Sequence, residues 1–185
     1  MNLQEVLNKW NIKCDLNTIL SLWNEPHRYY HSLNHLNDLI NQINENKSRY
    51  SEKEYEQLLI AALFHDCIYD PMRSDNEEKS ADFFIQCCGE KKDDDILQIK
   101  QIILDTKNHQ PTTNLSRAFS NYDLNIIERD FQQLLEWEMG ISEEYKGYNK
   151  EEYKKARLSF LESLLDRYVD NRENLRKLVD WVKNN

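Results

Sequence analysis

The sequence predicts an all-α protein, a single helical bundle of about eight helices over residues 1–185. The chain contains only three glycines and three prolines, too few for an architecture of strands and tight turns. Apolar residues recur at spacings of three and four almost throughout, which is typical of helices that bury one face. No repeat, linker or low-complexity tract divides the chain, so we expect one domain.

Three helices are predicted in the amino-terminal part. Residues 2–10 and 16–24 have the spacing of two short helices, and the second ends before Pro26. Ser32 is a residue type that caps helices, and a single apolar stripe follows it at Leu33, Leu36, Leu39, Ile40 and Ile43. We therefore expect a third helix to begin just after Ser32 and to bury that stripe.

The central helix of the bundle is predicted after residue 51. The segment "SEKE" at 51–54 is a capping box, a pair of side chains that satisfies the first backbone N–H groups of a helix. This helix is expected to run to about Asp66, and its second half, "LLIAALF", is apolar nearly all round. A helix that is apolar on every side belongs in the middle of a bundle.

Two polar connections separate the remaining predicted elements. A loop at 70–75 follows the central helix, and residues 107–122 are expected to form the second connection. The other helices are predicted at 76–88, 95–106, 123–139, 150–168 and 172–183. Loops on a rigid helical frame commonly carry chemistry, so both connections are candidates for a functional site.

Composition excludes several classes of partner. The net charge is −9 and no basic run occurs, which argues against nucleic-acid binding. No apolar stretch reaches the length of about 18 residues that spans a membrane, and "MNLQEVLNKW" lacks a secretory pattern. The four cysteines show no CxxC spacing, so we interpret them as reduced thiols of a cytoplasmic protein. No pattern indicates an oligomeric state.

His65 and Asp66, directly after "LLIAALF", form the candidate functional centre. An imidazole and a carboxylate at the end of a buried segment need a partner, and a metal cation satisfies both. His35 is the last of three histidines spaced by four in "HRYYHSLNH", so on one helix the three would share a face. Asp123 opens the predicted helix at 123–139. Each has an ordinary alternative, since such histidines often only pack and Asp123 suits a helix N-cap.

Two imidazoles and two carboxylates suit a divalent ion such as manganese, iron, cobalt, nickel or magnesium. They leave coordination positions free for water and substrate. Zinc also accepts these ligands, although its closed structural sites are usually rich in cysteine. The sequence therefore predicts an open site for a divalent metal ion.

His35, His65–Asp66 and Asp123, in this order on a helical frame, resemble the H…HD…D signature of the HD superfamily of metal-dependent phosphohydrolases. The chain is similar in particular to a small branch described only as predicted HD phosphohydrolases. The similarity is strongest over 22–165, and it is carried by "YHSLNH" at 30–35, "FHDCIYD" at 64–70, "DNEEKSA" at 75–81, Thr106 with His109, and "DL" at 123–124.

This resemblance implies an enzyme that hydrolyses a small phosphorylated substrate, such as a nucleotide, by attack of metal-bound hydroxide. The segment around His31 is similar to the "YHN…H" motif of cyclic-nucleotide phosphodiesterases, in which the first histidine protonates the leaving group. By this resemblance His31 is the expected general acid. Asp70 is a candidate to orient the attacking water or hold a second ion, with an Asx turn before Pro71 as its alternative. The implied metal ligands are His35, His65, Asp66 and Asp123.

Four further residues are candidates for contact with the substrate or the metal: Arg28, Glu77, Lys107 and His109. Glu77 has the alternative of a solvated acid in a first helical turn, and His109 has that of an exposed loop residue. Arg28 and Lys107, like Arg157, carry the charge that a phosphate needs.

Two positions depart from the branch, since Asn121 replaces the first aspartate of a "DxDL" segment and Ser142 replaces an arginine. These departures favour an alternative, an HD-fold protein that binds metal or a nucleotide without turnover. A third interpretation is a di-iron oxygenase of the same fold. Such enzymes typically have two further histidines between the HD pair and the last aspartate, where this chain has only His109.

Overall fold

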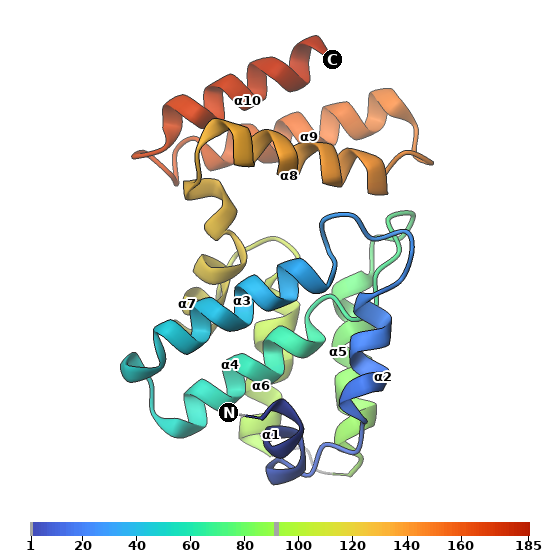
Figure 1. Cartoon of the computed structure of the whole chain (residues 1–185), viewed down its shortest axis with the longest axis vertical. Helices are drawn as coiled ribbons and strands as arrows, with labels where there is room; N and C mark the ends of the chain where they lie inside the picture. Colours follow the sequence, from blue (N-terminus) through green and yellow to red (C-terminus); the bar gives the residue numbers. More distant parts are fainter. Residues whose placement is uncertain (1, 91–92) are drawn as a thin grey trace. The chain divides into compact units, whose positions relative to one another are not determined.

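The computed structural model describes residues 2–90 and 93–185, and this part of the chain is all-α (Figure 1). It contains ten α-helices, two short 3-10 helices and no strand. The all-α prediction is therefore confirmed, with ten helices in place of about eight. The backbone divides into two compact units, one ending at Asp123 and one from Leu124 to Asn185. One domain over 1–185 stays a prediction.

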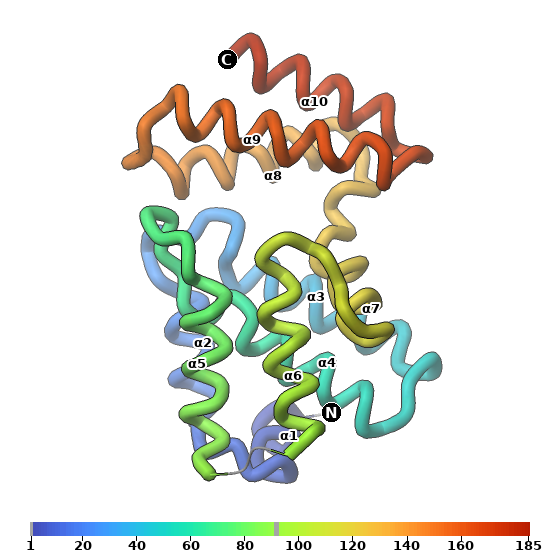
Figure 2. Tube along the Cα trace, turned by 180° about the vertical axis from the view of Figure 1, so that it is seen from behind, coloured from blue at the N-terminus to red at the C-terminus, as the bar shows by residue number. Residues whose placement is uncertain are grey.

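The first unit is built around α4, which contacts every other α-helix of the unit. All side chains of α4 from Tyr55 to Phe64 are buried, and α4 lies between α3 and α6 in Figures 1 and 2. The elements of this unit are α1 (Leu3–Lys9), α2 (Leu16–Trp23), α3 (Leu33–Glu45), the 3-10 helix η1 (Lys47–Arg49), α4 (Glu52–Phe64), α5 (Asn76–Cys88), α6 (Asp94–Asp105) and α7 (Asn114–Asp123).

The capping box predicted at the start of α4 is present. Ser51 Oγ accepts a hydrogen bond from the backbone N–H of Glu54 at 3.3 Å, and Glu54 Oε2 accepts one from the backbone N–H of Ser51 at 2.9 Å. The helix ends at Phe64, slightly before the predicted end near Asp66. His65 and Asp66 therefore begin the turn that follows the central helix.

The prediction of a polar connection over 107–122 is wrong in its second half, where α7 forms. Thr113 Oγ1 accepts from the backbone N–H of Ser116 at 3.0 Å, and Ser116 Oγ accepts from that of Thr113 at 3.0 Å. This reciprocal cap uses polar side chains that the sequence pattern suggested for a loop. As a consequence Asp123 ends α7 and does not open the next helix. The buried face of α7 includes Leu115 and Phe119.

The second unit is a group of three helices after a 3-10 turn. The helix predicted at 123–139 begins later, because Asp130 caps it by accepting from the backbone N–H of Gln133 at 2.9 Å. Helix α10 contacts both α8 and α9. The elements are η2 (Asn125–Glu128), α8 (Phe131–Glu144), α9 (Lys150–Leu164) and α10 (Arg172–Asn184).

A buried ion pair joins α8 and α9 inside this unit. Arg157 Nε donates to Glu138 Oε2 at 2.7 Å, and the Tyr153 hydroxyl donates to Glu138 Oε1 at 3.1 Å. The Glu138 side chain is 2% exposed. The arginine considered for phosphate binding is thus paired with a carboxylate.

The expectation of four reduced thiols is wrong for one pair. Cys14, between α1 and α2, and Cys87, in α5, form a disulfide with their Cα atoms 5.3 Å apart. The two cysteines are 73 residues apart in the chain, and the spacing of cysteines alone does not show which of them pair. Cys67 and Cys88 are buried and keep their thiols.

No helix in the described part of the chain combines the length and the apolar character needed to cross a membrane.

Candidate metal centre

The turn after α4 carries His65 and Asp66 and is held by α5. Ser80 Oγ accepts from the backbone N–H of Ile68 at 3.1 Å and donates to its carbonyl at 3.2 Å. The Asn76 side chain bonds both backbone groups of Asp70, at 3.1 and 2.9 Å. These bonds replace the helical partners that the backbone loses beyond α4, so the turn has a defined shape.

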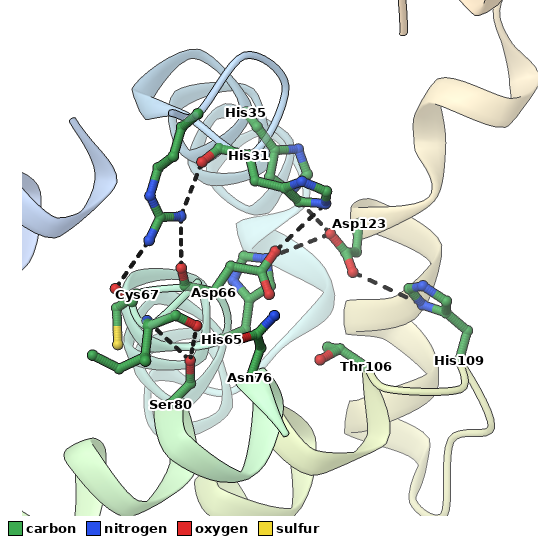
Figure 3. Close-up of polar contacts among 12 residues, drawn as sticks. His31, His35, His65, Asp66, Cys67, Asn76, Ser80, Thr106, His109 and Asp123 are labelled. Atoms are coloured by element: carbon green, nitrogen blue, oxygen red, sulfur yellow. Dashed lines mark hydrogen bonds and ion pairs between the residues drawn. The ribbon is translucent and has the colours of Figure 1, made fainter. Parts of the chain in front are cut away.

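The four predicted metal ligands lie together in the first unit (Figure 3). Asp123 Oδ1 is 3.0 Å from His35 Nε2 and 3.5 Å from His65 Nε2. Asp66 Oδ2 is 3.4 Å from the same nitrogen of His65. Donor atoms of His35, His65 and Asp66 all lie within 4.8 Å of one another, a grouping that is able to hold a metal ion. The residues come from α3, from the turn after α4 and from the end of α7.

The ring of His65 has one nitrogen without a hydrogen-bond partner. Its Nδ1 lies 3.0 Å from the backbone carbonyl of Ala62, which accepts hydrogen bonds, so Nδ1 carries a proton. Its Nε2 is buried and has no hydrogen bond, while Asp66 and Asp123 lie on that side. A histidine whose other nitrogen is bonded to a carbonyl has the orientation common among metal ligands. The donor set of His35, His65 and Asp66 therefore suits a divalent ion, and the carboxylate of Asp123 lies beside the same two imidazoles.

Two aromatic rings pack against His65 and help to bury it. The ring centroids of Trp23 and Phe119 lie 5.2 and 5.3 Å from that of His65. The side chains of His65 and Asp123 are 1% and 9% exposed. In such surroundings an uncompensated charge is costly, so a counter-charge among these groups is strongly favoured.

The pKa values of the centre follow from this burial and from its charges. Burial lowers the pKa of His65, but the negative charge of Asp66 and the contact with Asp123 outweigh it and raise that pKa to about 9. Burial raises the pKa of Asp123, but the contacts with His35 and His65 hold it well below its usual value. Without a cation, the His65 ring is therefore protonated on both nitrogens at neutral pH. A metal ion would compete with the proton on Nε2.

His31, the predicted general acid, lies beside the centre. Its Nε2 is 3.9 Å from Asp66 Oδ2, and its side chain is 21% exposed. Its ring centroid lies 4.5 Å from that of Tyr69 and 5.1 Å from that of Tyr30, whose ring is nearly perpendicular to it. The expected reason for this position was wrong, because α3 begins at Leu33 and His31 precedes it. The histidines at 27, 31 and 35 therefore do not share one helix face.

His109 approaches Asp123 from the connection between α6 and α7. Its Nδ1 is 3.9 Å from Asp123 Oδ2, and its backbone has a φ of 47°, which is uncommon for a residue other than glycine. Asp105 holds this connection, since its Oδ2 accepts from the backbone N–H and the hydroxyl of Thr112, both at 2.8 Å. His109 is thus directed at the centre and is only partly exposed.

The other predicted residues have different surroundings. Asp70 is exposed, and its Oδ1 accepts from the backbone N–H of Met72 at 2.9 Å, which is an Asx turn. Glu77 is partly buried in the first turn of α5, where burial, with a contribution from the charge of Asp66, raises the pKa of its carboxyl. Lys107 donates to Glu78 and, at 2.6 Å, to the carbonyl of Ser74.

Arg28 is enclosed by protein groups, and its guanidinium donates to backbone carbonyls of the turn that carries Asp66. Asn121, one of the departures from the branch, is exposed in the last turn of α7. The sequence reasoning did not identify the structural roles of Asn76, Ser80 and Arg28. The signal available for the first two was a pair of polar residues four apart on the buried face of an amphipathic helix.

Comparison of the chain with family models, with curated proteins and with solved structures gives no match. The resemblance to the HD superfamily therefore stays a prediction.

Proposed function

We propose that this protein is a phosphohydrolase that cleaves a small phosphate ester, such as a nucleotide, with a divalent metal ion. The observation that carries the proposal is the buried Nε2 of His65, which has no hydrogen bond and faces two carboxylates. In the proposal His35, His65, Asp66 and Asp123 hold the ion. When bound at such a site, a divalent ion acidifies water and polarises a phosphoryl oxygen.

In this proposal His31 donates a proton from Nε2 to the leaving oxygen. Its ring is packed against Tyr69 and Tyr30 and reaches Asp66 at 3.9 Å, so it lies next to the proposed ion site. Its 21% exposed side chain also leaves it accessible to a substrate and to proton exchange with solvent. These are the properties that a general acid needs.

His109 orients Asp123 in this proposal. Its Nδ1 lies on the side of Oδ2, at 3.9 Å, whereas His35 lies on the side of Oδ1, at 3.0 Å. Two imidazoles, one near each oxygen, favour one orientation of this carboxylate. Such outer contacts commonly contribute about 10–100-fold in metal affinity or activity.

The proposal is tested by metal content and hydrolysis measured on the same samples. The variants are Asp123→Asn and, as a matched control, Asp38→Asn, an exposed aspartate of α3. The substrates are an aryl phosphate and a panel of nucleotides, each with added manganese. We expect metal and hydrolysis in the wild type and in Asp38→Asn, and loss of both in Asp123→Asn.

Two outcomes would contradict the proposal. If no metal binds after manganese or iron is supplied, the four residues are not a metal site. If metal binds and is lost in Asp123→Asn but no phosphate ester is cleaved, the protein is a metal-binding protein without this activity.

A further inference from the structure

Arg28 joins two segments that lie far apart in the sequence. Its Nη1 donates to the carbonyl of His31 at 3.0 Å and to that of Asp66 at 2.8 Å, and its Nη2 donates to the carbonyl of Cys67 at 3.1 Å. One nitrogen therefore bonds the backbone of the proposed general acid and the backbone of a proposed metal ligand.

The guanidinium is also fixed from its other sides. Nε donates to Glu25 Oε2 at 3.2 Å, and the group lies 5.5 Å from the centroid of the Trp23 ring and 5.2 Å from that of the Tyr69 ring. The bonds use one N–H of Nε, two of Nη1 and one of Nη2, and the side chain is 0% exposed. A group so enclosed is not presented to a substrate phosphate.

Both segments need an external donor. His31 precedes α3 and Asp66 follows α4, so their carbonyls lie outside the regular helical hydrogen bonds. A cation at the carboxyl end of α4 is also favoured by the helix dipole. Arg28 supplies the donors and the charge from one rigid planar group, which a lysine cannot reproduce.

We propose that Arg28 is a positioning residue, which holds His31 at a set distance from Asp66 and makes no contact with the substrate. The catalytic consequence rests on the proposed function. If His31 must reach the leaving oxygen, a shift of about 1 Å would lower kcat by up to about 100-fold. Binding of the substrate, and hence KM, would change little.

The test is Arg28→Lys, with Arg73→Lys as the control, because Arg73 is exposed and its guanidinium pairs with the carboxylate of the nearby Asp75. We expect Arg28→Lys to keep its bound manganese and its KM within about twofold, while kcat falls about 10- to 100-fold. The control should match the wild type. A rise in KM at unchanged kcat would show that Arg28 binds substrate and would overturn the proposal.

A second measurement does not depend on activity. The ring centroid of His31 lies 4.5 Å from that of Tyr69, so the carbon-bound proton signals of His31 report its position, and they are recorded without added metal. We expect these signals to move in Arg28→Lys and the amide protons of residues 65–70 to exchange faster. Unchanged signals and exchange would overturn the proposal. If the wild type hydrolyses nothing, the proposed function fails, yet this measurement still tests the role of Arg28.

A third measurement uses the wild type alone and covers the case in which Arg28→Lys does not fold. The guanidinium N–H protons of Arg28 should exchange slowly, and their signals should not move when inorganic phosphate is added to the metal-free protein. Fast exchange, or a shift that saturates with phosphate, would contradict the enclosed positioning role.

Discussion

The two units of this protein each bury a cluster of charged side chains, and the clusters differ in their balance of charge. In the second unit, the single negative charge of Glu138 meets the permanent positive charge of Arg157 at 2.7 Å. Tyr153 donates to the other carboxylate oxygen, and the Arg157 guanidinium lies 4.2 Å from the centroid of the Trp137 ring. The chain supplies all the charge that this cluster needs.

In the cluster of the first unit, the negative charges are not neutralised by permanently charged side chains of the cluster. Asp66 and Asp123 bring two carboxylates, whereas His35 and His65 are uncharged unless they take up protons. Histidine is thus the residue that permits an exchange of a proton for a metal ion, which a permanently charged arginine would prevent. The comparison teaches that a buried ion pair with arginine is typically structural, whereas carboxylates facing histidines leave a place for an external cation.

The largest expected effect is a loss of hydrolysis, and we expect it only when the cluster of the first unit is changed. Asp66→Ala should lose the metal and about 10³-fold or more of the hydrolysis, since a metal ion contributes several kcal/mol to the transition state. Glu138→Gln should retain its metal content. Metal analysis and initial rates on a cleaved nucleotide check both. Equal metal loss in the two variants would end the distinction between the clusters.

The next effect concerns stability and belongs to the second unit. Glu138→Ala leaves the Arg157 charge buried without its partner, so we expect the free energy of unfolding to fall by about 3–5 kcal/mol. The double variant Glu138→Leu with Arg157→Met should recover most of this loss, because no charge then remains buried. Urea unfolding followed by circular dichroism measures both. A single variant as stable as the wild type would show that the pair is dispensable.

A smaller effect is expected from metal on the stability of the first unit. Manganese at about 100 times its dissociation constant should raise the free energy of unfolding by about 2.7 kcal/mol, and a chelator should reverse this. Asp123→Asn should show no such gain, whereas Glu138→Gln should show it in full. A gain of the same size in Asp123→Asn would place the ion elsewhere.

The smallest effect is the pH dependence of metal binding. The pKa of His65 without metal is raised to about 9, so the proton is bound at pH 7 and must leave when the metal binds. We expect release of about one proton per ion and an affinity that rises about tenfold per pH unit up to about pH 9. Calorimetry in buffers of different ionisation enthalpy measures this release. No release at pH 7 would show that His65 is not a ligand.

The same pKa shift determines how the stability of the protein without bound metal depends on pH. Because the folded pKa of His65 lies above its usual value of 6.5, its charged contacts stabilise the fold fully below pH 6.5. That contribution is lost as the pH rises through about 9. For Asp123, whose pKa is lowered, the contribution is present above its usual value and is lost as the pH falls.

Local patterns predicted much of the fold. The capping box at Ser51 and the apolar run "LLIAALF" identified the central helix, because capping and burial on every side are properties of the segment itself. The same reasoning missed α7, because Thr113 and Ser116 use polar side chains to cap a helix, and polar residues are equally common in loops.

For the candidate centre, the residue types were predicted and their surroundings were not. The resemblance to the H…HD…D signature implied His35, His65, Asp66 and Asp123, and these four residues lie together. The expected helix face shared by the histidines was wrong for His31, whose place depends on packing with Tyr69 and on a bond from Arg28. No spacing in the sequence encodes such contacts between segments.

The sequence by itself determined the all-α class and the central helix, because these follow from composition and from local periodicity, and its resemblance to the H…HD…D signature indicated the residues of the candidate centre. Only the tertiary structure decided which side chains face one another. It paired Cys14 with Cys87, brought Asp123 to His35 across 88 residues, and enclosed Arg28 behind the turn of Asp66. The physical reason is that long-range contacts depend on how whole helices pack, and packing is a property of the assembled chain.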